Sequence, residues 1–153
     1  MTEAELLFAA RAAVLKWQPR LHLLDWEIEV AIGALDDDRE NGRSSLAQVK
    51  MGYTIKRARI TFPANFERRC DDDAYAYPPD AEARVETVVV HELLHVTEQP
   101  FHARISGEVE NLVGADGAFG LELRTAYTYY RENWINAQTR VLIEADRLGG
   151  WSR

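Results

Sequence analysis

Residues 88–96 read VVVHELLHV, and the arrangement of the rest of the chain follows from this stretch. Apolar residues fall on nearly every side of the helix that it would form, so the helix is expected to run buried through the centre of the domain. Asp80 is a good candidate for its N-cap, and Pro100 is a residue that stops helices. We therefore predict a helix over residues 81–99 that ends at the proline.

Three polar residues interrupt this apolar helix. His91 and His95 are four positions apart, so they lie one above the other and both imidazoles can point at one ion. Zinc binds such nitrogens at about 2.1 Å. Glu92 is turned about 100° from His91, which keeps it out of the ligand set but close to a water molecule beside the ion. Because buried polar groups are costly without partners, the pattern favours a metal site over a helix that happens to contain histidines.

Length and charge limit the class of protein. A chain of 153 residues is the size of one domain, and we predict a single domain over residues 1–153. The net charge of -7 argues against nucleic acid or an anionic membrane as the main partner, since both need a positive surface. Cys70 is the one cysteine and lies in the polar run ERRCDDDA, so we expect a loop thiol without a role.

The N-terminal stretch indicates a compartment. Glu3 and Glu5 stand where a secretory signal would carry basic residues, and Arg11 breaks the apolar run. No run approaches the about 18 apolar residues of a membrane span. The expectation is a soluble, cytoplasmic protein.

The remaining elements predict an α+β fold. Residues 3–17 read as a helix capped by Thr2, and residues 25–32 alternate as a strand with an acidic outer face. Residues 46–62 read as two strands with a bend near 54–57. The basic residues Lys56, Arg57 and Arg59 alternate with apolar ones, so we expect them to form one solvated face of a strand. Residues 63–80 and the glycine-containing 103–120 read as connections, and 121–148 as a last helix. The predicted architecture is an N-terminal helix, a short twisted sheet of about three or more strands, a buried helix and a long C-terminal helix.

The HELLH motif gives a family resemblance. The stretch VVVHELLHV, after a strand region and a Pro-Pro-Asp helix start, resembles the active-site helix of zincin metallopeptidases. The layout is similar to that of small single-domain zincins, with minigluzincins and SprT-like proteins nearest. The resemblance implies a zincin-like fold, zinc at His91 and His95, and Glu92 as general base in peptide-bond hydrolysis. It also implies that the chain is an endopeptidase whose substrate is a protein or a peptide.

The third ligand is open at this point. Metzincins place a histidine six positions after the second, but Phe101 stands there and His102 is one place late. Gluzincins use a glutamate of a later helix, and the candidates are Glu108, Glu110, Glu122, Glu132 and Glu144. Glu132 is preferred, because it shares an apolar stripe with Ile135 and Leu142 and because YYRENWINAQTRVLIE resembles the glutamate-bearing helix of small gluzincin-like proteins. Glu122 and His102 stay as alternatives, as does Asp116 for an aspzincin-type site.

Two functions follow from such a site. The first is a zinc-dependent peptidase, in which one of the strands within 46–62 pairs with an extended substrate. The second is a non-catalytic zinc-binding structural or regulatory module, in which the metal joins the central helix to the last one. Glu92 counts against the second function, because a purely structural site gains nothing from it.

Overall fold

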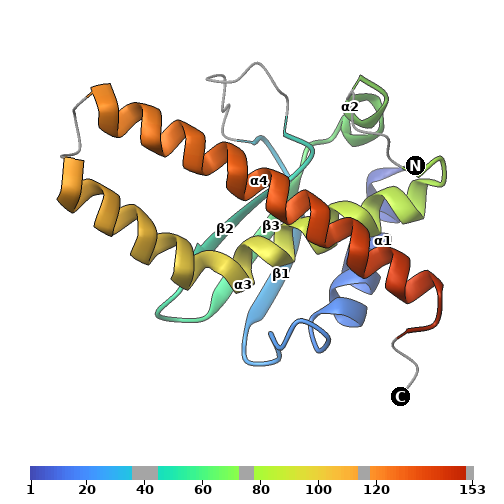
Figure 1. Ribbon diagram of the computed structural model, residues 1–153. Coiled ribbons are helices and arrows are strands. Elements are labelled where there is room, and N and C mark those ends of the chain that lie inside the picture. The colour runs from blue at the N-terminus through green and yellow to red at the C-terminus, as the bar shows by residue number, and fades with distance from the viewer. Residues whose placement is uncertain (36–44, 73–77, 114–117, 151–153) are drawn as a thin grey trace. The chain divides into compact units, whose positions relative to one another are not determined.

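The computed structural model describes residues 1–35, 45–72, 78–113 and 118–150 (Figure 1). The elements in these ranges are α1 (Glu3–Trp17), β1 (Glu27–Ile32), β2 (Gln48–Gly52), β3 (Arg57–Phe62), α2 (Phe66–Asp72), α3 (Ala81–Val113) and α4 (Ala118–Arg147). The predicted α+β class is confirmed, whereas the zincin-like form of it stays a prediction. The chain divides into two compact units, Met1–Val96 and Thr97–Arg153. None of the helices in the described ranges combines the length and the apolar character needed to cross a bilayer.

Helix α1 begins at a complete capping box, which confirms the predicted helix over 3–17. The backbone N–H of Glu5 donates to the Thr2 hydroxyl at 3.3 Å, and the Glu5 carboxylate accepts from the Thr2 backbone N–H at 2.7 Å. At the other end, the indole N–H of Trp17 donates to Glu86 of α3 at 2.6 Å, and Lys16 pairs with the same carboxylate at 2.6 Å. The buried Trp17 thus ties the end of α1 to the beginning of α3.

The sheet has one apolar and one charged face. Its order is β1-β3-β2, with β1 parallel and β2 antiparallel to the central β3. The predicted strands are confirmed, and residues 53–56 turn the chain between β2 and β3. On the charged face Arg57 pairs with Glu27 at 2.5 Å and Arg59 with Glu29 at 2.8 Å, all four side chains being exposed. The basic residues are therefore a solvated strand face, as predicted, and each exposed pair contributes little to stability.

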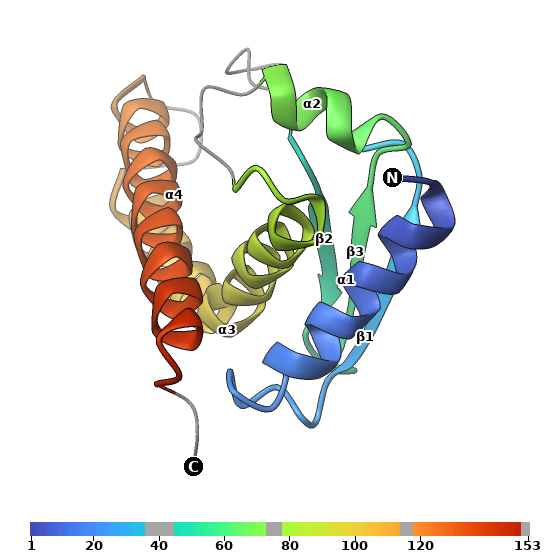
Figure 2. The ribbon, with the colours of Figure 1, turned by 90° about the vertical axis from the view of Figure 1, so that its right-hand side faces the viewer.

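The apolar face of the sheet carries the core of the first unit. Ala58, Ile60 and Phe62 of β3 are 3% exposed or less. Helix α1 and the first half of α3 both lie on this face (Figure 2). Asp80 caps α3 as predicted, since its carboxylate accepts from the backbone N–H of Ala83 at 2.7 Å. The α3 side chains in the core are Val85, Val88, Val89, Val90, Leu93, Leu94 and Val96. The prediction of a buried central helix is confirmed.

Helix α2 was not predicted. Residues 63–80 were expected to be an irregular connection and Cys70 a loop thiol, but residues 66–72 are helical and Cys70 is only 5% exposed. Phe66, four positions earlier, is 2% exposed and packs edge-on against Phe62 with ring centroids 5.3 Å apart. These two residues form the buried side of a two-turn helix, which is too short for a periodic pattern to show in a polar run.

Helix α3 continues through Pro100, and this corrects two predictions. The helix was expected to end at the proline and residues 103–120 to be irregular, but α3 runs to Val113 and α4 begins at Ala118. A proline inside a helix removes one backbone hydrogen bond and costs about 3 kcal/mol. The second unit offsets this cost by contacts of α3 on either side of the proline. The last helix, predicted over 121–148, is confirmed as α4.

These contacts join α3 to α4 within the second unit. The rings of His102 and Tyr127 are stacked, with centroids 5.3 Å apart and planes 5° from parallel. Arg131 donates to the Glu98 carboxylate at 2.5 Å. One turn forward on α3, from Glu98 to His102, corresponds to one turn backward on α4, from Arg131 to Tyr127. The second half of α3 and α4 are therefore antiparallel (Figure 1).

The continuity of α3 can be tested by replacing its helix-disfavouring residues. We expect Pro100→Ala to raise the free energy of unfolding by about 2 kcal/mol, which is the regained helix stability less about 1 kcal/mol for the freer unfolded chain. Gly107→Ala should raise it by about 0.5–1 kcal/mol, because nothing lies within 4 Å of the added Cβ. Urea denaturation followed by circular dichroism measures both. A chain whose helix ends at Pro100 would gain nothing from either change.

Candidate metal site

The two histidines of the motif face each other on α3. Their Nε2 atoms are 3.1 Å apart, and the ring centroids are 4.9 Å apart with planes at 70°. Two nitrogens that bind one zinc ion at about 2.1 Å in a tetrahedron lie about 3.4 Å apart. The i, i+4 spacing of His91 and His95 thus brings two ligand atoms to nearly the separation that one ion requires.

The same helix turn buries the glutamate of the motif. Glu92 is 7% exposed and His95 is 9% exposed, and both lie among the fully or nearly buried side chains of the first unit. Glu92 is turned by about 100° from His91, so it does not share the ligand face. A carboxylate in such an apolar helix is costly unless a polar partner compensates it.

Glu132 of α4 completes a group of three. Among the described residues, one ligand atom each of His91, His95 and Glu132 lies within 4.8 Å of the other two; His95 is nearly buried, and His91 and Glu132 are partly buried. This group could hold a metal ion. Two imidazoles and one carboxylate are the donor set of several catalytic zinc sites, in which the fourth position stays open for water or substrate. The residues therefore fit a divalent metal, and their role as ligands stays a prediction.

The alternative third ligands lie elsewhere or outside the described residues. Because α3 does not end at Pro100, His102 is a half-buried residue of this helix, and it stacks on Tyr127. Neither it nor the exposed Glu108, Glu122 and Glu144 is part of the group. The side chain of Glu110 and the whole of Asp116 fall outside the described residues.

An ion pair that the sequence did not reveal lies beside the candidate ligands along both helices. Glu98 follows His95 by three positions, and Arg131 directly precedes Glu132. Their side chains are 10% and 13% exposed, so the pair is well shielded from water. Burial, and then the Glu98 carboxylate, raise the pKa of Tyr127, which keeps this phenol protonated at neutral pH.

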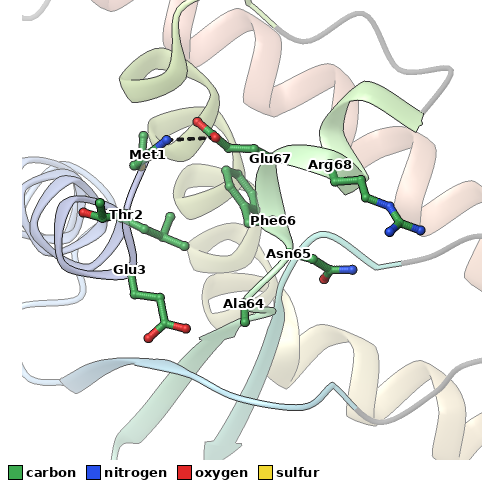
Figure 3. A pocket seen from close by; sticks show the side chains of 9 residues that line it. Met1, Thr2, Glu3, Ala64, Asn65, Phe66, Glu67 and Arg68 are labelled. Atoms are coloured by element: carbon green, nitrogen blue, oxygen red, sulfur yellow. Dashed lines mark hydrogen bonds and ion pairs between the residues drawn. The ribbon is translucent and has the colours of Figure 1, made fainter.

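Two pockets of the first unit do not coincide with the motif. One, of about 230 Å³, lies between the beginning of α1 and the beginning of α2, where the Met1 ammonium pairs with Glu67 at 2.8 Å (Figure 3). The other, of about 350 Å³, lies on the charged face of the sheet. None of the three motif residues lines either pocket. The candidate site is therefore located by its three potential metal ligands and not by either of these pockets.

A scan against protein-family models finds no match, and searches of the curated proteins and of the solved structures find none either. The interpretation of the site therefore depends on the chemistry of the side chains of this chain.

The third ligand can be identified by zinc affinity. We expect Glu132→Ala to weaken zinc binding by more than about 100-fold, beyond the loss typical of residues outside the ligand set. Glu122→Ala, a matched change on an exposed position of α4, should leave the affinity unchanged. Competition with a chromophoric chelator measures both constants. Equal affinities of the Glu132→Ala variant and the unmodified protein would remove this residue from the site.

Proposed function

We propose that the protein is a zinc-dependent metallopeptidase that hydrolyses peptide bonds. The observation that carries the proposal is the buried Glu92 beside two histidines whose Nε2 atoms are 3.1 Å apart. A metal site alone requires only ligands. A carboxylate next to the ligands but off their face is the additional group that hydrolysis requires.

The proposed mechanism gives metal binding to three residues and proton transfer to a fourth. His91, His95 and Glu132 would hold the ion, and a zinc ion bound there would polarise a carbonyl group and lower the pKa of a water molecule toward 7. Glu92 would accept a proton from that water as it attacks the carbonyl carbon. The same carboxyl group would then give the proton to the amine that leaves when the peptide bond breaks. The glutamate thus acts as base and then as acid, and it ends in its starting state.

The sheet offers a way to bind an extended substrate. Among the described strands, β2 is at one edge and β3 is central, so of the two strands within residues 46–62 only β2 has an edge to which a strand could be added. A peptide that pairs with β2 would be held by its backbone, largely independently of its side chains. The proposed substrate is therefore an extended segment of a protein or a peptide, cleaved within the chain.

A non-catalytic zinc module is the competing function. Such a module would gain stability from zinc through the same three residues. Structural zinc sites usually close with four protein ligands and often use thiolates, whereas the only cysteine, Cys70, lies in α2 and is not part of the group. Among the described residues the group has three ligands and not four, and this, together with Glu92, favours hydrolysis.

The proposal is tested by Glu92→Gln. This change keeps the size of the side chain but removes its basicity, so the variant should bind zinc like the unmodified protein and hydrolyse a quenched fluorescent casein about 10²–10⁴-fold more slowly. Glu122→Gln, a matched change at an exposed position, serves as control and should keep full activity.

Two results would contradict the proposal. Equal hydrolysis by the Glu92→Gln variant would assign the activity to a contaminating protease. Stoichiometric zinc without hydrolysis of casein or of a mixed peptide library by the unmodified protein would support the non-catalytic module instead.

A further inference from the structure

We propose that the buried ion pair of Glu98 and Arg131 is a positioning device, which orients Glu132 for metal binding and keeps the Glu98 carboxylate out of the ligand set. This inference rests on the proposed metal site but not on peptidase activity. It assigns a role to two residues that the proposed mechanism does not use.

The position of Glu98 on α3 makes it a competing ligand. His91, His95 and Glu98 are spaced by four and three residues, so they lie along one stripe of the helix. A carboxylate one turn beyond the second histidine could therefore turn toward an ion held by the pair. Arg131 donates to this carboxylate at 2.5 Å, and a charge-assisted bond of that length holds it in place.

Arg131 also determines the rotation of α4. Adjacent residues of a helix point about 100° apart, so a helix whose Arg131 is held at Glu98 presents Glu132 in one defined direction. The Tyr127–His102 stack lies one turn away and belongs to the same antiparallel register. The two contacts together fix the register of α4 along the second half of α3 within the second unit, and Glu132 is the acidic residue of α4 that belongs to the ligand group found among the described residues.

Burial makes the ion pair sensitive to single changes. The two side chains are only 10% and 13% exposed, so removal of Arg131 would leave the Glu98 charge shielded from water without its cation. Such a charge gains strongly from any cation nearby. A metal ion bound by the histidines would be that cation, and Glu98 would then replace or crowd the proposed ligand.

The test compares zinc affinities in a double-mutant cycle. We expect Arg131→Met to weaken zinc binding by about 10–100-fold, the range for residues that orient ligands. In a chain that already carries Glu132→Ala, the same Arg131→Met change should weaken binding no further, because the residue to be oriented is absent. Arg131→Lys should restore part of the affinity. Arg140→Met, at an exposed position of the same helix, is the matched control and should change nothing.

A second variant separates a loss of zinc affinity from a loss of folding. Glu98→Gln combined with Arg131→Met removes both charges, so it leaves no buried charge behind and should stay folded by circular dichroism while binding zinc more weakly than the unmodified protein. Unchanged affinity in the Arg131→Met and double-charge variants would overturn the inference. An equal loss from Arg131→Met with and without Glu132 would also overturn it, since the ion pair would then act on the fold in general. Absence of zinc from the unmodified protein would instead overturn the proposed function.

Discussion

The placement of two imidazoles and a carboxylate in an otherwise apolar, buried stretch of helix is the constraint on which the rest of the structure depends. Val88, Val89, Val90 and Leu93 hold this part of α3 in the core of the first unit, so that Glu92 and His95 are buried with them and His91 is partly buried. Buried polar groups of this kind destabilise a fold unless something compensates them. One divalent ion with its water can satisfy all three residues at once, which no single side chain could do. Function and stability would thus share the same few atoms.

The surrounding elements follow from the need to enclose that helix. The sheet supplies one apolar face, made by alternate residues of β3, and it turns its paired charges away from the core. Helix α1 lies on the same face and is fixed to α3 by the Trp17–Glu86 hydrogen bond. These elements could be predicted from the sequence because each carries a periodic pattern of several residues: period two in the strands, and a capping box followed by a helical stripe in α1.

The parts that could not be predicted are those in which tertiary contacts override a local signal. Pro100 is a strong stop signal on local grounds, yet α3 continues because Glu98 and His102, on either side of it, both contact α4. One sequence signal was present: His91, His95, Glu98 and His102 repeat at spacings of four, three and four across the proline. Such a polar stripe indicates a continuous helix only when the helix that packs against it is known, and here that helix is α4. In the same way, the preference for Glu132 over Glu122 came from the side of α4 on which apolar residues lie, whereas the grouping with the histidines required coordinates. Helix α2 was missed because two turns are too short for periodicity to register.

The central claim is that His91 and His95 hold a metal ion together, and metal content tests it most directly. Native mass spectrometry of the protein purified without added metal, and again after zinc is added and unbound zinc removed, would give the stoichiometry. The proposed function predicts one zinc ion per chain, lost in both His91→Ala and His95→Ala but kept in the matched His22→Ala variant, whose residue lies outside the group. A native protein that takes up no metal, or that keeps its zinc in both histidine variants, would contradict the claim and leave the HELLH stretch as a packed helix.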